Sequence, residues 1–98
     1  MKKVLVVCSG GLGTSLVLKL QVKQHFQEWE LDDVIVEQSD VSAASFMKAD
    51  LIIGAKQVVQ HLRVKETEIL GLSFIADRAL VKESLENANT VKRWRERV

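Results

Sequence analysis

The chain has 98 residues, 47% of them hydrophobic, and a formal net charge of +1, which together are typical of one small globular domain spanning residues 1–98. So small a net charge provides no strong electrostatic bias toward nucleic acid or acidic lipid. No apolar run reaches about 18 residues, so a membrane-spanning helix is excluded. The single cysteine cannot form an internal disulfide. The composition therefore indicates a cytoplasmic protein with no nucleic-acid partner.

The first predicted element is a strand over Val4–Val7. Its apolar residues show no polar alternation, which is typical of a strand covered on both faces in a parallel sheet. The strand leads to the only cysteine, Cys8, and a segment with three glycines and three hydroxyl residues follows. This segment is predicted to be a loop that binds phosphate, and it consists of Ser9, Gly10, Gly11, Leu12, Gly13, Thr14 and Ser15.

A helix is predicted from Ser15 to about Trp29, because Leu18, Val22 and Phe26 recur at helical spacing and form one apolar stripe. The following segments alternate between strand and helix patterns. In chain order they are a strand over 34–36, a short helix over 41–48 that packs Ala44, Phe46 and Met47, a strand over 49–54 stopped by Gly54, a short helix over 57–62 and a strand over 68–72.

One last helix is predicted after Asp77, whose carboxylate suits the N-cap position. Its apolar stripe consists of Val81, Leu85, Ala88, Val91 and Trp94. This alternation of strands and helices predicts an open four-stranded parallel α/β sheet with helices on both faces and the strand order 2-1-3-4. Ligands of such sheets bind beyond the carboxyl ends of the strands at the switch point, which is where Cys8 is expected.

The segment after Cys8 predicts phosphate chemistry on a thiol. Glycines let backbone N–H groups approach a ligand closely, and a helix N-terminus adds partial positive charge, so the segment suits a phosphate-like dianion. The same field favours the thiolate of Cys8, which is the nucleophilic form of cysteine.

Two nucleotide-binding loops agree poorly with this segment. A nucleoside-triphosphate loop requires Gly-Lys-Ser/Thr, whereas Gly13 is followed by Thr14. A dinucleotide loop, G-x-G-x-x-G, matches Gly11 and Gly13 but fails at Leu16, although Glu37 imitates the acid that binds the ribose. A nucleotide ligand is therefore the weakest of the interpretations.

The cysteine phosphatase loop, C-x5-R-[ST], agrees better. Cys8 matches its nucleophile and Ser15 its terminal hydroxyl, but Thr14 stands where that loop has arginine. The arginine clamps the transferring phosphoryl group with two hydrogen bonds, which threonine cannot do. The segment is therefore expected to hold a phosphoryl group while being poorly equipped to hydrolyse it.

The run from Cys8 through Ser9-Gly10-Gly11-Leu12-Gly13-Thr14-Ser15 resembles the signature of IIB components of the bacterial phosphotransferase system, in particular the galactitol/ascorbate-like group. The chain also resembles these components in length and in strand–helix order. In the lactose/cellobiose-like branch of the family a cysteine likewise follows the first strand, with a less glycine-rich loop.

The resemblance implies a cytoplasmic phosphocarrier that associates with the inner face of the membrane through its permease. It implies that Cys8 accepts a phosphoryl group from a phosphohistidine on a IIA protein and donates it to a sugar held by the membrane IIC component. Residues 9–15 are then the phosphate-binding loop. The sequence has no cluster of metal ligands at suitable spacing, so no metal or other cofactor is expected.

Two other functions stay open from the sequence. One is a small cysteine phosphatase or arsenate-reductase-like enzyme, against which Thr14 and the lack of further cysteines argue. The other is a non-catalytic module that reports phosphorylation state to a partner, with the basic residues near the C-terminus as its interaction surface.

Several side chains outside the loop are predicted to have structural roles. His25 and His61 are expected at surface or boundary positions. Trp29 and Trp94 continue apolar stripes and are expected in the core. The basic residues among 92–97 are expected to complement the dipole of the last helix.

Overall fold

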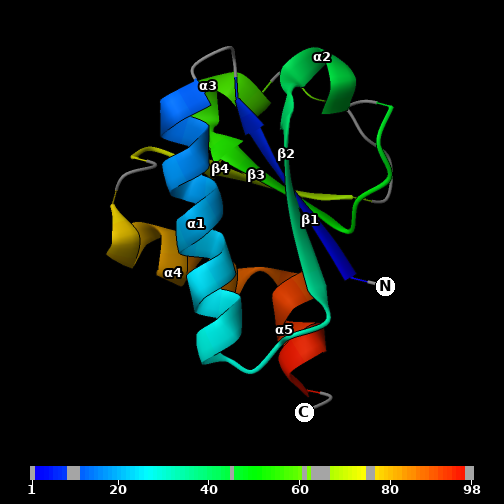
Figure 1. The fold of residues 1–98 in the computed structure, drawn as a ribbon, viewed down its shortest axis with the longest axis vertical. Helices are drawn as coiled ribbons and strands as arrows, with labels where there is room; N and C mark the ends of the chain where they lie inside the picture. The colour runs from blue at the N-terminus through cyan, green and yellow to red at the C-terminus, as the bar shows by residue number, and fades with distance from the viewer. Residues whose placement is uncertain are drawn as a thin grey trace.

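The computed structural model is a parallel sheet with helices on both faces (Figure 1). It describes residues 2–8, 12–44, 46–60, 62, 67–74 and 77–96, and for residues 8 and 12–15 it describes the backbone. The strands are β1 (Lys2–Cys8), β2 (Val34–Asp40), β3 (Leu51–Ala55) and β4 (Glu68–Leu72). The helices are α1 (Leu12–Glu28), α2 (Val41–Ala44), α3 (Lys56–Val59), α4 (Arg78–Asn87) and α5 (Asn89–Glu96).

The four strands are parallel and follow the order β2-β1-β3-β4, which confirms the predicted topology. β1 is paired on both sides: Cys8 is level with Asp40 of β2, and Val7 is level with Gly54 of β3. Because the strands are parallel, their carboxyl ends meet at one edge of the sheet. No helix in the described part of the chain is both long and apolar enough to span a bilayer.

Each face of the sheet has its own core. α1, α4 and α5 cover the larger core, which includes Val4, Val6, Leu18, Val22, Phe26, Leu51, Ile53, Leu72, Val81, Leu85 and Val91. α2 and α3 cover the smaller core of Leu5, Val7, Ala44, Ile52 and Val59. Successive residues of a strand point to opposite faces, so the unbroken apolar run in β1 serves both cores.

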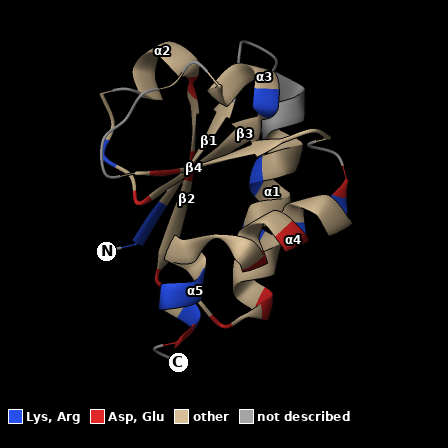
Figure 2. Ribbon diagram, turned by 180° about the vertical axis from the view of Figure 1, so that it is seen from behind, with Lys and Arg blue, Asp and Glu red and all other residues tan. Residues whose placement is uncertain are grey.

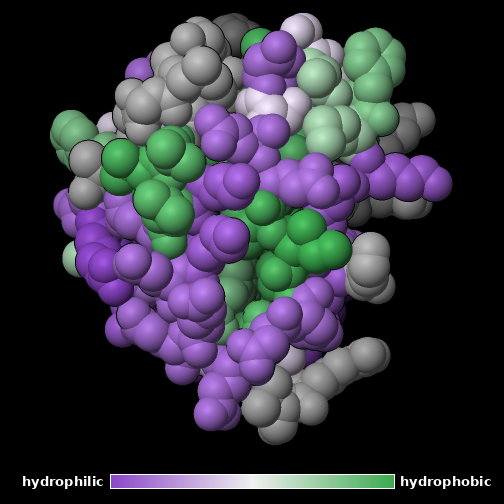
Figure 3. Space-filling model, in the orientation of Figure 1, coloured by the Kyte–Doolittle hydropathy of each residue, from purple (hydrophilic) through white to green (hydrophobic). Residues whose placement is uncertain are grey.

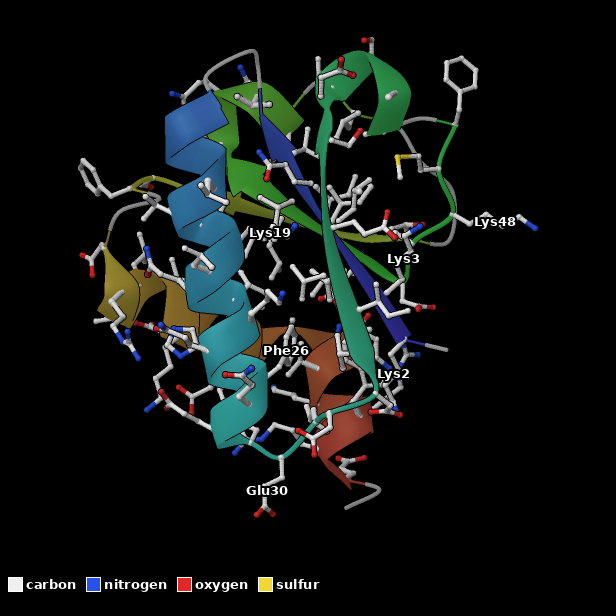
Figure 4. All side chains as sticks on the ribbon, in the orientation of Figure 1. Lys2, Lys3, Lys19, Phe26, Glu30 and Lys48 are labelled. Atoms are coloured by element: carbon white, nitrogen blue, oxygen red, sulfur yellow. The ribbon has the colours of Figure 1, made fainter. Side chains whose placement is uncertain are left out.

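The apolar stripe of α1 is confirmed, since Leu18, Val22 and Phe26 are all buried. Phe26 points from α1 toward α5 (Figure 4). Its ring lies 5.9 Å from that of Trp29 and 6.0 Å from that of Trp94, measured between centroids. Both tryptophans are partly buried against the larger core, as the sequence predicted.

The prediction for His25 is wrong, because its side chain is 1% exposed. It lies on α1 between the buried Val22 and Phe26, and it stacks on Trp29 at 6.0 Å between ring centroids. Burial lowers the pKa of His25, and the positive charges of Arg78 and Lys82 lower that pKa further. The face of α1 that carries His25 was expected to be exposed, but the beginning of α4 covers it.

The predicted last helix is in fact two helices. α4 begins at the predicted N-cap, where the Asp77 carboxylate accepts a hydrogen bond from the Leu80 amide at 3.1 Å. α4 ends at Asn87, the C-cap residue Ala88 is extended with a ψ of 130°, and α5 begins at Asn89. The Glu68 carboxylate of β4 accepts hydrogen bonds from the amides of Asn89 at 3.0 Å and Thr90 at 2.8 Å. A carboxylate from a distant strand therefore accepts hydrogen bonds from the first amides of α5, which allows a separate helix to begin there.

Two shorter segments also differ from the prediction. α2 ends at Ala44, and Phe46, which was predicted to pack, is 90% exposed. Met47 does pack against the smaller core. α3 is one turn, and the predicted last residue of that helix, Leu62, contributes to the same core from outside it.

Candidate phosphoryl-transfer site

The candidate site lies at the carboxyl end of β1, where the Cys8 backbone ends the strand. The chain leaves β1 through α1 to reach β2 on one side, while β3 pairs with β1 on the other side. This is the switch point of the sheet, where parallel sheets bind ligands. The end of β1, the N-terminus of α1 and the short helix α2 lie at the same end of the molecule (Figure 1).

Gly54 fixes the position of this strand end. A Cβ atom at residue 54 would lie 2.6 Å from the Val7 carbonyl oxygen and 3.0 Å from Cγ1 of Val59. No side chain fits at that distance from a backbone oxygen. Gly54 is therefore required inside β3 by close approach, and the prediction that it stops the strand is wrong.

α1 begins at Leu12, three residues before the predicted start at Ser15. Gly13, Thr14 and Ser15 are therefore in the first turn of the helix, and the predicted loop is shorter than expected. The N–H groups of the first four residues of a helix have no carbonyl partner within it, so those of residues 12–15 point out of the N-terminus. The first turn has no acidic residue of its own, so no carboxylate within it offsets its partial positive charge.

Asp40 is the described acidic residue level with Cys8. Its Oδ1 accepts hydrogen bonds from the Ala43 amide at 2.7 Å and from the Ser42 hydroxyl at 3.0 Å. These hydrogen bonds, the Ala43 amide first, hold the pKa of Asp40 below its ordinary value. The carboxylate therefore stays ionised at neutral pH and is tied to the beginning of α2.

The structure brings most of the predicted site residues to one place. The backbones of Cys8 and residues 12–15 meet at the carboxyl end of β1. Ser9, Gly10 and Gly11 were predicted to complete the loop, and they lie outside the described residues. His61 lies outside the described residues as well. Asp77 caps α4, which is the structural role that the sequence favoured.

α1 also has an exposed apolar face that was not predicted from the sequence. Leu16 and Val17 are each 49% exposed, and Leu20 is 51% exposed. Figure 3 shows these hydrophobic side chains as a patch over the N-terminal half of α1. A signal was present in the sequence, because residues 16, 17 and 20 are apolar although they fall outside the buried stripe of Leu18 and Val22.

The basic residues of α5 lie at the end of the molecule opposite to the candidate site, and Arg95 has its partners there. Figure 2 shows Lys and Arg gathered on α5. The Arg95 guanidinium lies 4.6 Å from the centroid of the Trp29 ring and 3.9 Å from the Glu86 carboxylate. α5 is remote from the end of β1 that carries Cys8 (Figure 1), so its charge is not part of the candidate site.

This arrangement suits the transfer of an anionic group. It combines the only thiol of the chain with a helix N-terminus that has no acid of its own in its first turn. A phosphoryl group on sulfur carries its negative charge on oxygens, and backbone N–H groups stabilise such charge without needing a metal. The sequence has Thr14 where the phosphatase loop has arginine.

Comparisons with known proteins agree with this chemistry. Residues 3–90 match the family model described as "PTS system, Lactose/Cellobiose specific IIB subunit". A similar solved structure is that of the lactose-specific IIB component domain of the phosphoenolpyruvate:carbohydrate phosphotransferase system from Streptococcus pneumoniae. The two chains are 25% identical with a TM-score of 0.62, over 87% of this chain and 91% of that one. Comparison with curated protein sequences finds no match.

These findings confirm the predicted family and correct the branch. The sequence resembled the galactitol/ascorbate-like group, whereas the matching model and the solved relative are both of the lactose/cellobiose type. The branch was chosen on the glycine-rich character of residues 9–15, and the comparisons do not support that choice. With a match over residues 3–90, the chain belongs to the IIB subunit family of the bacterial phosphotransferase system and is a phosphoryl-carrying component of that system.

Proposed function

We propose that Cys8 carries the phosphoryl group, accepting it from a phosphohistidine on a IIA protein and donating it to a sugar held by a IIC membrane protein. Membership of the IIB family supports the transfer chemistry and both partners. Cys8 is the only thiol of the chain, and its backbone lies at the carboxyl end of β1. The backbone position of the only cysteine, at the switch point of the sheet, is the observation that supports the proposal.

The reaction has two displacements at phosphorus. In the first, the Cys8 thiolate attacks the phosphohistidine, an S–P bond forms and the N–P bond breaks, and the leaving imidazole takes up one proton from solution. In the second, a sugar hydroxyl oxygen attacks the same phosphorus, an O–P bond forms and the S–P bond breaks. The thiolate is regenerated, and the hydroxyl proton passes to it or to a base in solution. Neither step changes an oxidation state.

The residues after Cys8 stabilise the charge on the transferring group. We assign this role to the N–H groups of residues 9–15 and to the Thr14 and Ser15 hydroxyls. Loss of one strong donor to a developing oxyanion commonly costs about a hundredfold or more in rate. Because Thr14 replaces the arginine of a phosphatase, attack of water on phosphocysteine is slow, and the adduct survives until the acceptor arrives.

The exposed apolar face of Leu16, Val17 and Leu20 is proposed to be the docking surface for the IIA protein. Direct transfer requires the donor histidine to reach Cys8, so the partner must cover the surface beside the N-terminus of α1. These three side chains lie in the second and third turns of α1, next to that N-terminus. The protein would then act in the cytoplasm, at the inner face of the membrane that holds the IIC component.

The test is phosphorylation by a purified phosphorylated IIA protein, followed by intact mass spectrometry. The wild-type chain is expected to gain one phosphoryl group on Cys8 and to keep it for minutes or longer, whereas the Cys8→Ala variant gains none. A generic aryl phosphate is expected to be hydrolysed at a negligible rate. Labelling on His25 or His61 would contradict the mechanism. Rapid release of inorganic phosphate that depends on Cys8 would instead identify a phosphatase.

A further inference from the structure

The position of Asp40 suggests an influence on Cys8 that family membership does not assign. Cys8 and Asp40 are register partners at the adjoining ends of β1 and β2. Neighbouring strands lie about 4.8 Å apart, so the two backbones are separated by that one spacing. Asp40 is thus a full negative charge placed beside the residue that would carry a phosphoryl dianion.

The carboxylate is held in place. Its Oδ1 receives the Ala43 amide at 2.7 Å and the Ser42 hydroxyl at 3.0 Å, and the Ser39 hydroxyl donates to the Asp40 carbonyl at 3.1 Å. Ala44, at the end of the same short helix, is fully buried in the smaller core. The turn that carries the charge is therefore anchored to the sheet and cannot move away freely.

No cation among the described residues neutralises Asp40. The described ion pairs are Lys2–Asp33, Lys3–Glu37, Arg78–Glu28 and Arg95–Glu86, and none of them includes Asp40. Lys56 is exposed and follows the end of β3, on the other side of β1. Within the described residues, the field of Asp40 at the end of β1 is therefore not cancelled by an ion pair of its own.

We infer that Asp40 raises the transfer potential of the phosphoryl group on Cys8 by like-charge repulsion. This inference rests on the proposed function of Cys8. The N-terminus of α1 stabilises the S-phosphoryl group, and Asp40 opposes that stabilisation, so the group is held without becoming too stable to pass on. The same repulsion makes the free thiolate of Cys8 less favourable than the N-terminus of α1 alone would make it.

Two neutral substitutions isolate the charge. Asp40→Asn and Asp40→Ser both leave a side-chain oxygen that can accept the Ala43 amide, since Asn and Ser are good N-cap residues. Asp33→Asn is the matched control, because Asp33 precedes the other end of β2, where it pairs with Lys2. It removes the same charge about 20 Å farther along the strand direction, given a rise of about 3.3 Å per residue.

The first measurement is the rate of alkylation of the only cysteine as a function of pH at low ionic strength. Both Asp40 variants are expected to lower the midpoint, by about half a pH unit if one unit charge acts over about 7 Å in water. The shift is expected to shrink at about 1 M salt, where screening acts over about 3 Å. A loss of packing would not produce that salt dependence. An unchanged midpoint, or an equal shift in Asp33→Asn, would overturn the inference.

The second measurement is the equilibrium between phosphorylated IIA protein and the chain. The fraction of phosphocysteine is expected to rise about threefold to tenfold in both Asp40 variants and to stay at the wild-type value in Asp33→Asn. An equilibrium that does not change in the Asp40 variants would overturn the inference. If the wild-type chain accepts no phosphoryl group, the proposed function fails, and the alkylation measurement still decides the effect of Asp40 on the thiol.

Discussion

Two helix N-termini in this molecule interact with negative charge in opposite ways. The N-terminus of α5 receives the Glu68 carboxylate, which accepts hydrogen bonds from the Asn89 and Thr90 amides. The N-terminus of α1 has no acidic residue in its first turn. α5 lies at the end of the molecule opposite to Cys8, whereas α1 begins beside the end of β1 (Figure 1).

The two N-termini therefore differ in role: that of α5 is structural, and that of α1 is functional in our proposal. A carboxylate supplied by the chain cannot leave, so Glu68 holds α5 against β4 permanently. A phosphoryl group supplied by a partner can leave, and the N-terminus of α1 has no carboxylate in its own first turn that would compete with it. The same physical interaction thus serves packing at one end of the sheet and, in our proposal, transfer at the other end.

The largest effect is expected at Gly54, where β3 closely approaches the carboxyl end of β1. Gly54→Ala places a Cβ atom 2.6 Å from the Val7 carbonyl oxygen, so β1 and β3 must separate at their carboxyl ends. We expect a loss of about 2–3 kcal/mol in the free energy of unfolding and a clear loss of phosphoryl acceptance. Urea denaturation and intact mass measure the two effects.

Gly71→Ala is the matched control for this variant. Its Cβ atom would lie 3.3 Å from Cα of Lys56 and from Cγ2 of Val59, which requires only a small adjustment. We expect a loss of less than about 1 kcal/mol and normal phosphoryl acceptance. Equal losses in the two glycine variants would show that the close approach at Val7 is not what fixes the strand end.

The second largest effect is expected at the N-terminus of α5, which receives the Glu68 carboxylate. Glu68→Gln removes the charge at the N-terminus of α5 and is expected to cost about 1–2 kcal/mol of stability. Phosphoryl acceptance by Cys8 should stay at the wild-type level, because α5 lies at the opposite end of the molecule. Loss of phosphoryl acceptance without loss of stability would contradict the division between the two N-termini.

Glu68 also predicts a direction of pH dependence. Burial works to raise the pKa of Glu68, but hydrogen bonds from Thr90 and Asn89 outweigh it and hold the pKa below its ordinary value of 4.5. The contribution to stability is therefore complete above that value and is lost as the pH falls through the lower pKa of the folded state. Unfolding curves of Glu68→Gln should lose this acidic component.

A third prediction tests the surface beside the N-terminus of α1. Leu20→Ser removes part of the exposed apolar face and is expected to slow phosphorylation by the IIA protein about threefold to tenfold at low donor concentration. Its stability and the alkylation midpoint of Cys8 should not change, because Leu20 is half exposed. Gln27→Ser, on an exposed position farther along α1, provides the control and should react at the wild-type rate.

The smallest effect is expected at His25, which lies between α1 and α4. Burial, with the charges of Arg78 and Lys82, lowers the pKa of His25 from 6.5, so the folded state favours the neutral ring. Stability should therefore fall as the pH drops below 6.5 toward the lower pKa of the folded state. In His25→Phe, which keeps an aromatic ring against Trp29, this decline should disappear from thermal unfolding curves recorded across that range.

The sequence was sufficient for the strands because each is a compact local pattern. Val4–Val7 indicates a doubly covered strand on its own, and the alternation with helices leads to the strand order. Asp77 was recognised as an N-cap for the same reason, since it bonds to an amide three residues away. The position of Cys8 at the end of β1 followed from these two inferences together.

The remaining features depend on contacts between distant segments. The separation of α4 from α5 depends on Glu68, 21 residues before Asn89. The need for Gly54 depends on the Val7 carbonyl of another strand, and the burial of His25 depends on where α4 begins. Asp40 could not be connected with Cys8 until the register of β1 and β2 was known. None of these contacts leaves a periodic signal in the local sequence.

The aromatic contacts around Phe26 determine what intrinsic fluorescence can report about this protein. The chain has two tryptophans, and the rings of both lie within about 6 Å of Phe26, between the end of α1 and α5. Emission therefore follows the separation of α5 from α1, with a red shift as these indole rings become solvated. The phosphorylation of Cys8 that we propose would occur at the other end of α1 and should leave the emission spectrum unchanged.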